Sequence, residues 1–192
     1  TEKLNQMSLE HNDLSQAIEK LKSGIRELNK EGRERLINSF EKVNEKFVYL
    51  FKKLFNGGNA KLVLNGEDPL EAGLEIFASP PGKKMQSLSL LSGGEQALTS
   101  ISLIFSVFLC NPSPVCILDE VDAALDDTNV NNFCELLETL VKEQDIKFII
   151  VTHHRLTMAK MNQLLGVTMQ EKGISKLLTV DLEKAVKIKE AS

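Results

Sequence analysis

Val115-Cys-Ile-Leu-Asp-Glu120 is the stretch that decides the fold of this chain. Four apolar residues in a row are followed at once by two carboxylates. A short, wholly apolar run predicts a strand buried on both faces of a parallel sheet. Open α/β sheets bind their ligands at the carboxyl ends of the strands. We therefore expect Asp119 and Glu120 to stand at the edge of the sheet where a site is built.

The rest of the chain continues the alternation of strands and helices. Phe148-Ile-Ile-Val151 is a second apolar run, and Thr152, His153 and His154 follow it. A helix predicted over residues 128–143 connects the two runs. The other predicted elements are helices from Ser92 to about Cys110 and near 155–164, and strands at Lys61–Leu64, Gly73–Phe77, 165–170 and 175–181. This order indicates the α/β class, with a parallel-sheet core, flanking helices and small additional strands.

The N-terminal residues 1–30 are predicted to form one helix of a coiled coil. Residues of a narrow, almost wholly apolar stripe recur at alternating spacings of three and four. The stripe consists of Leu4, Met7, His11, Leu14, Ile18, Leu21, Ile25 and Leu28. A second stripe, richer in phenylalanine, starts one residue late at Leu36. We therefore predict a coiled-coil arm and neck over 1–45, a domain over 46–186 and a tail over 187–192. The alternative is a solvated amphipathic helix on a globular core.

The charge of the chain does not indicate nucleic-acid binding by itself. The net charge is −4, so there is no strong basic field. Any contact with DNA is expected to come from a local patch or from a partner. Lys83-Lys84 is one candidate patch, and a solvated loop is the alternative interpretation.

The sequence predicts neither a secreted protein nor a membrane protein. Cys110, Cys116 and Cys134 form no C-x-x-C pair and lie in apolar runs, so we expect buried free thiols in a reducing compartment, with metal ligands as the alternative. Ala97–Cys110, the most apolar segment, is shorter than the ~20 residues of a membrane helix. The chain begins at Thr1 without a methionine, as expected of a processed protein or of a piece of a longer one.

The polar residues at the two strand ends have the chemistry of a phosphate-transfer site. Asp119 is suited to hold Mg²⁺ directly or through water, and Glu120 to orient or deprotonate an attacking water. His153 is expected to reach the same crevice. The alternatives are a pair of carboxylates that starts a turn and a structural histidine. Asp122-Ala-Ala-Leu-Asp126 lies between them, either as part of the site or as the N-terminal cap of the next helix.

Leu88-Ser-Leu-Leu-Ser-Gly-Gly-Glu-Gln96 precedes a predicted helix and has the character of an anion site. Ser92 and Glu95 fit a capping box, and the free amides of a helix start attract anions. No lysine follows the glycines, and the pattern G-x-x-x-x-G-K-[ST] of a Walker A loop does not occur in these 192 residues. The chain therefore carries half of a nucleotide site.

Four short strings, taken together, resemble the motifs of ABC-type ATPases and occur in the same order. They match the signature, the Walker B strand, the D-loop and the switch histidine. The strings are Leu91–Gln96, Cys116–Glu120, Ala124–Asp126 and Val151–His153. Longer strings resemble the C-terminal head of bacterial SMC (structural maintenance of chromosomes) proteins. These are Pro80–Lys84, Ser87–Glu95 and Leu118–Asp127, and the resemblance covers essentially the whole chain.

The resemblance implies the C-terminal lobe of an ABC-type ATPase head with an N-terminal coiled-coil stub. It implies that Walker A lies in the N-terminal segment of the same protein and that two heads of a homodimer enclose ATP and Mg²⁺. By the same resemblance, Ser92, Gly93 and Gly94 are expected to contact ATP in trans, and Asp126 is expected to belong to the D-loop. Asp119 is expected to bind Mg²⁺ and Glu120 to activate the attacking water. His153 is expected to sense the γ-phosphate. Glu95 is inserted relative to the transporter signature, so Gln96 receives no phosphate contact.

The resemblance also implies partners and a cellular role. A kleisin subunit is expected to bind near residues 165–185, and DNA is expected to be bound and entrapped during chromosome condensation and segregation. The implied location is the cytoplasm, at the nucleoid, without a membrane. A DNA-repair ATPase of the zinc-hook or RecN type and a non-enzymatic coiled-coil adaptor are the alternatives. A transporter subunit is disfavoured, because transporter signatures are not preceded by a heptad coil.

Overall fold

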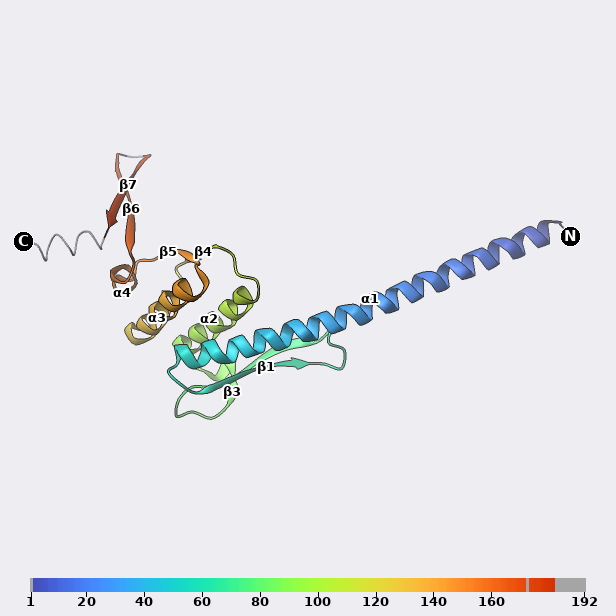
Figure 1. Ribbon diagram of the computed structural model, residues 1–192, viewed down its shortest axis with the longest axis horizontal. Coiled ribbons are helices and arrows are strands. Elements are labelled where there is room, and N and C mark those ends of the chain that lie inside the picture. The colour runs from blue at the N-terminus through green and yellow to red at the C-terminus, as the bar shows by residue number, and fades with distance from the viewer. Residues whose placement is uncertain (1, 172, 182–192) are drawn as a thin grey trace, which may run out of the picture.

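The computed structural model describes residues 2–171 and 173–181. Its dominant feature is α1 (Glu2–Leu54), a single helix of 53 residues that starts far outside the domain and ends inside it (Figure 1). The apolar stripe of the outer half is exposed at Met7, Leu14, Ile18, Leu21, Ile25 and Leu28. The side chain of Leu4 lies outside the described set, as does the tail predicted over 187–192. Pairing of this stripe with another helix stays a prediction.

The inner half of α1 contacts the domain at three places along its length. Arg33 donates from Nε and Nη2 to the two oxygens of Asp68, at 2.9 and 2.5 Å, and this pairing lowers the pKa of Asp68 to about 2. Asn44 accepts a hydrogen bond from the backbone N–H of Leu62 at 2.9 Å. Further along, the helix enters the core with four fully buried residues, Phe47, Leu50, Phe51 and Leu54. The helix is therefore anchored over its last six turns.

α1 is followed by Asn56-Gly-Gly-Asn59, residue types that are typical of a helix end and a turn. Asn56 adopts the left-handed conformation with φ 52°, and the N–H of Gly57 bonds to the carbonyl of Lys52 at 2.9 Å. This is the Schellman pattern of a helix C-terminus. Gly58 has φ 75°, and a Cβ there would lie 2.4 Å from the carbonyl oxygen of Ser79. Only glycine fits at this position.

The predicted strand pair after α1 is confirmed and gains a third strand. β1 (Asn59–Asn65), β2 (Gly73–Ser79) and β3 (Gln86–Ser87) form an antiparallel sheet in the order β1-β2-β3. The sheet packs on α1 through a small cluster of buried residues: Phe47, Phe51, Ala60, Leu62, Ala78 and Leu91. β3 has two residues, which is too short for a periodic signal in the sequence.

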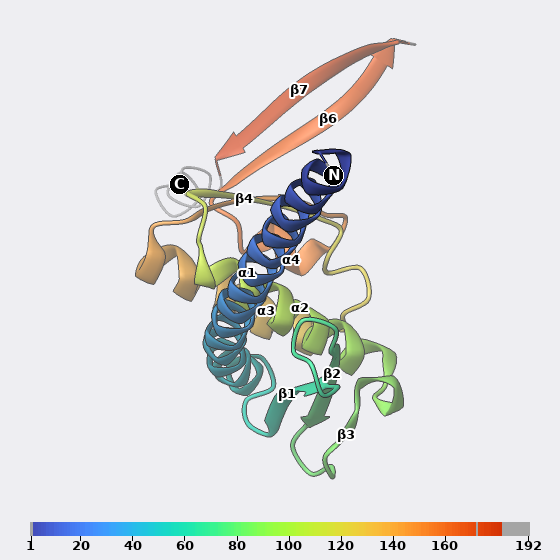
Figure 2. The ribbon, with the colours of Figure 1, turned by 90° about the vertical axis from the view of Figure 1, so that its right-hand side faces the viewer.

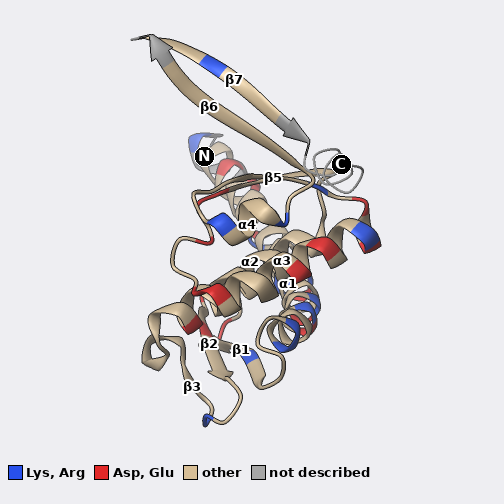
Figure 3. Ribbon diagram, turned by 90° about the vertical axis from the view of Figure 1, so that its left-hand side faces the viewer, with Lys and Arg blue, Asp and Glu red and all other residues tan. Residues whose placement is uncertain are grey.

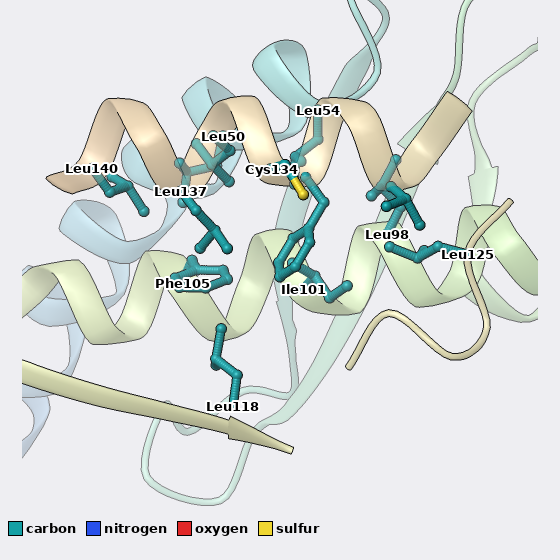
Figure 4. Close-up of a cluster of buried hydrophobic side chains, with 13 residues drawn as sticks. Leu50, Leu54, Leu98, Ile101, Phe105, Leu118, Leu125, Cys134, Leu137 and Leu140 are labelled. Atoms are coloured by element: carbon teal, nitrogen blue, oxygen red, sulfur yellow. The ribbon is translucent and has the colours of Figure 1, made fainter. Parts of the chain in front are cut away.

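The main core lies between α1, α2 (Gly93–Cys110), α3 (Asp127–Gln144) and β4 (Val115–Asp119) (Figure 4). α2 and α3 begin and end within one residue of their predicted positions. By length and composition, α2 is the one helix among the described residues that could cross a membrane. Its buried residues Leu98, Ile101 and Phe105 lie in this core, however, and a core helix has the same composition.

β4 and β5 (Lys147–Val151) form a parallel pair, as the two apolar runs predicted. The prediction that β4 is buried on both faces is wrong for this chain. Leu118 packs on the core from one face, whereas Ile117 on the other face is 68% exposed. The outer row comprises Val115, Ile117, Ile149 and Val151, all between 44% and 68% exposed. Helices cover one face of the pair, and no described residue covers the other.

The C-terminal elements are shorter or more separate than expected. α4 (Arg155–Ala159) has five residues instead of the predicted ten, because the chain turns at Lys160 and enters β6 (Gln163–Glu171). β6 pairs with β7 (Ile174–Asp181) in an antiparallel hairpin that projects from the domain (Figures 1 and 2). Both strands were predicted, but this hairpin is a separate sheet.

The three cysteines differ in environment. Cys134 is a buried free cysteine, as predicted, and burial raises the pKa of its thiol. Cys116 is half-buried. The prediction is wrong for Cys110, which is exposed because it is the last residue of α2.

Candidate functional site

The carboxyl edge of β4 and β5 carries the predicted acidic residues and histidine. Asp119 pairs with Val151 at the end of the ladder, and the N–H of Glu120 bonds to the carbonyl of Val151 at 2.9 Å. Glu120 then adopts φ 47°, the left-handed region that non-glycine residues seldom enter. The chain turns sharply there, with the N–H of Ala123 bonded to the carbonyl of Glu120 at 3.1 Å. Such backbone conformations are concentrated at functional sites.

The structure brings Glu120 and His153 together. His153 Nδ1 lies 3.8 Å from Glu120 Oε1, and both side chains are more than half exposed. The distance is too long for a hydrogen bond, so both groups keep their capacity to bind a third group placed between or above them. Glu120 and His153 therefore form an exposed polar pair at the strand edge.

Asp119 is an exposed carboxylate at the same edge. The described residues contain no cluster of three or more His, Cys, Asp or Glu side chains that would hold a metal by themselves. Mg²⁺ does not need such a cluster, because it commonly binds one or two carboxylates together with phosphate oxygens and water. A single carboxylate at this position therefore fits Mg²⁺ that arrives with a nucleotide.

The loop after Glu120 contains two aspartates with different roles. Asp126 accepts a hydrogen bond at Oδ1 from the N–H of Asn129 at 2.8 Å, so it caps α3. The sequence had offered this N-terminal cap as one of two interpretations of the loop. Asp122 is fully buried, which the sequence did not indicate. Its Oδ2 accepts hydrogen bonds from Thr152 at 2.6 Å and from Thr157 at 2.5 Å.

The predicted capping box is formed at the start of α2. Ser92 donates to Glu95 Oε2 from its N–H at 3.0 Å and from its hydroxyl at 2.8 Å. A Cβ built on Gly93 would meet nothing within 4 Å, so the first turn of α2 is open to solvent at this point. Gly94 lies instead against the carbonyl of Ala124 and the side chain of Asn129. The signature and the Asp122–Asp126 loop are therefore neighbours.

Lys83 has a partner that the sequence analysis missed. Its Nζ lies 2.8 Å from Glu95 Oε1 and donates to Oε2 at 2.9 Å. This pairing, more than the hydrogen bonds from Ser92, lowers the pKa of Glu95. Lys83 and Lys84 lie in an exposed loop, as the solvated-loop interpretation predicted, and the ion pair of Lys83 ties this loop to Glu95 at the start of α2. Gln96 donates to the carbonyl of Leu91 at 3.0 Å, which occupies its amide, in line with its exclusion from the phosphate contacts.

The predicted site residues fall into two groups. Asp119, Glu120 and His153 share the strand edge, and Ser92, Gly93 and Gly94 share the start of α2 with the nearby Asp126 loop. Within the part of the chain that the structure describes, no hydrogen bond or ion pair joins the two groups.

Comparison with known proteins identifies the family. The family described as "RecF/RecN/SMC N terminal domain" matches residues 3–176. The "Chromosome partition protein Smc" of Cereibacter sphaeroides is 57% identical over 180 residues, which are 93% of this chain and 16% of that protein. The chain thus spans about one sixth of the length of this curated relative.

Two solved structures share the fold. One, described as "Structural biochemistry of ATP-driven dimerization and DNA stimulated activation of SMC ATPases", is 38% identical with a TM-score of 0.72, over 83% of this chain and 96% of that chain. The Smc head domain of Pyrococcus furiosus, with an extended coiled coil and bound to the C-terminal domain of ScpA, is 39% identical with a TM-score of 0.74, over 88% and 42%. The chain belongs to the RecF/RecN/SMC family, and it is part of an SMC head domain homologous to the Smc chromosome partition proteins.

Proposed function

We propose that this chain is the C-terminal half of an SMC ATPase head, which binds and hydrolyses ATP at the interface of two heads and so drives chromosome condensation and segregation. The observation that carries the proposal is the strand edge where Glu120 and His153 lie 3.8 Å apart beside Asp119. The residues there have the chemistry of ATP hydrolysis, and the chain has no Walker A loop to hold the nucleotide.

Each residue at the edge has a role in hydrolysis. Glu120 accepts a proton from the attacking water at a carboxylate oxygen, since it is exposed and free of hydrogen bonds to other described side chains. His153 lies beside it and contacts the γ-phosphate. Asp119 contributes one ligand to Mg²⁺, which neutralises charge on the phosphates when it is bound.

The uncovered face of β4 and β5 supports a second segment. Val115, Ile117, Ile149 and Val151 form an apolar row with no cover among the described residues. Burying an aliphatic side chain fully contributes about 1.5–3 kcal/mol, so this face favours association with more apolar surface. The N-terminal segment with Walker A is the expected cover, in an arrangement that puts the nucleotide at the strand edge.

The signature residues are suited to act on a second head. Gly93 is exposed at the start of α2, where backbone N–H groups and the helix dipole attract an anion. Ser92, Gly93 and Gly94 then contact ATP held by the Walker A of the partner head. Asp126 lies in the neighbouring loop and takes part in the same interface.

The remaining surfaces fit the other expected partners. The β6–β7 hairpin is apolar and exposed at Leu165, Val167, Met169, Ile174, Leu177 and Leu178. Figure 3 shows both strands of the hairpin mostly in tan, the colour of residues other than Lys, Arg, Asp and Glu. Lys176 is the one charged residue within 163–170 and 174–180, and Glu171 and Asp181 end the two strands. We assign the kleisin contact here, within residues 165–185, of which 172 and 182–185 lie outside the described residues. The P. furiosus head bound to ScpA supports such a partner. We also propose DNA binding and a location at the nucleoid in the cytoplasm, as the resemblance to SMC proteins implies.

One experiment separates this proposal from a non-enzymatic adaptor. The chain is mixed with the matching N-terminal segment, and assembly and ATP hydrolysis are measured together. We expect turnover that requires both segments and rises more than linearly with head concentration, because two heads form one site. A folded, assembled complex without hydrolysis supports the adaptor. The Smc relative at 57% identity disfavours a zinc-hook or RecN-type repair ATPase.

A further inference from the structure

A buried carboxylate connects the two loops of the strand edge. Asp122 is 0% exposed, and its Oδ2 accepts hydrogen bonds from the hydroxyls of Thr152 and Thr157. Its Oδ1 is buried and has no hydrogen-bond partner within the described part of the chain. Burying a carboxylate is costly unless its hydrogen bonds compensate. A fold that keeps one here, rather than an apolar residue, suggests a role other than stability.

The two threonines flank the histidine of the site. Thr152 directly precedes His153, and its hydroxyl accepts the N–H of His154 at 2.9 Å while donating to Asp122. The hydroxyl thus closes a tight turn around His153. Thr157 is buried on α4, the helix that follows the turn. Both sides of the His153 turn are therefore tied to one carboxylate oxygen.

The same carboxylate is fixed in the loop of the other residues. Asp122 is two positions after Glu120 and four before Asp126, and its carbonyl accepts the N–H of Leu125 at 3.1 Å. Leu125 is buried in the main core. The position of Asp122 relative to Glu120 is thus set by short backbone turns on both sides.

We propose that Asp122 is a positioning residue for ATP hydrolysis: through Thr152 and Thr157 it holds the His153 turn at a fixed distance from Glu120. The inference rests on the proposed function. Because Asp122 also belongs to the loop that reaches Asp126 and Gly94, a shift of that loop when two heads meet is carried to His153. Head pairing and placement of the catalytic groups are linked through this one side chain.

The test uses variants of Thr152 in the head assembled with its N-terminal segment. Thr152→Val removes the hydroxyl and keeps the shape, and Thr152→Ser restores the hydroxyl. Thr139→Val is the matched control, because the Thr139 hydroxyl bonds to the carbonyl of Glu135 on α3, away from the edge. We expect Thr152→Val to lower kcat about 10- to 100-fold with KM for ATP changed less than about threefold. Thr152→Ser is expected to recover most of kcat, and Thr139→Val to keep the parental kcat.

Asp122 itself is tested by two substitutions. Asp122→Asn keeps one oxygen that can accept both hydroxyls, whereas Asp122→Leu keeps none. We expect the loss of kcat to be several-fold smaller for Asp122→Asn. Equal losses for the two variants, or a Thr152→Val variant with parental kcat, overturn the inference. A rise in KM that matches the fall in kcat also overturns it, because that result indicates weakened ATP binding rather than misplaced catalytic groups.

A second measurement does not depend on turnover. When only this chain carries the isotope label in the assembled head, the ring signal of His153 can be assigned by NMR among its three histidines. We expect a shifted or broadened His153 signal in Thr152→Val and a parental signal in Thr152→Ser. An unchanged signal in Thr152→Val refutes the positioning role even if the complex hydrolyses no ATP. Absence of hydrolysis in the parental complex refutes the proposed function separately.

Discussion

Lys83→Met is expected to destabilise the head by removing the cation from Glu95. Glu95 is 18% exposed and accepts three hydrogen bonds, two from Ser92 and one from Lys83. A hydrogen bond to a charged group contributes about 1.5–3 kcal/mol. Lys83 is 47% exposed, so solvent screening reduces this contribution to about 1 kcal/mol. For a protein of this size the change lowers Tm by about 2–4 °C at pH 7.

The pH dependence gives this prediction a second signature. Lys83 is the main cause of the lowered pKa of Glu95, whose ordinary value is 4.5. A carboxylate with a lowered folded-state pKa stabilises the fold above its unfolded-state pKa, and the stabilisation is lost as pH falls through the folded-state pKa. The gap between parent and Lys83→Met is therefore expected to be full at pH 7 and to close below pH 4.5.

The assay is thermal unfolding of the full chain, monitored by circular dichroism at pH 7 and in steps below pH 4.5. Lys84→Met is the matched control, since this substitution removes the same charge at the next position. Lys84 has no ion-pair partner among the described residues. A Lys84→Met variant as destabilised as Lys83→Met refutes the reasoning. So does a gap that stays constant at low pH, because it cannot come from the Glu95 carboxylate.

Three further predictions concern the assembled head. Glu120→Gln is expected to keep ATP-dependent head pairing in size-exclusion chromatography and to lower turnover by about 10²- to 10⁴-fold; turnover at the parental rate means that Glu120 is not the base. Ser92→Arg is expected to abolish head pairing while nucleotide binding by the Walker A segment persists, and loss of nucleotide binding contradicts the assignment in trans. Ile117→Glu is expected to weaken association with the N-terminal segment at least about tenfold by calorimetry, and parental affinity shows that this face is not the interface.

Local signals allowed most elements to be predicted. Asn56 and the two glycines after it have the conformations of a helix end, and Ser92 with Glu95 has the spacing of a capping box. These signals depend on neighbours a few residues apart, so the sequence contains them in full. The carboxyl-edge position of Glu120 and His153 followed from two apolar runs, because parallel strands end at the same edge.

Features that depend on distant partners were not predictable. A run such as Val115–Leu118 has the same composition whether one face of the strand or both are covered. The sequence therefore does not indicate that Ile117 is exposed. Lys83 pairs with Glu95, which lies twelve positions further along the chain and is brought close only by the fold. Asp122 lies in an acidic, turn-rich stretch that resembles surface, and its burial depends on Thr152 and Thr157, about 30 positions further on.

α1 runs without interruption from the exposed N-terminal stripe into the buried core. No break separates the exposed stripe at Met7 from Leu50 in the core, and the helix rises about 65 Å between them. A tilt of about 5° at the buried end therefore moves the outer end by about 5–6 Å. α2, which carries the signature at its start, packs against this buried end. A small reorientation of the buried end is therefore amplified along α1 into a displacement of several ångströms at its outer end.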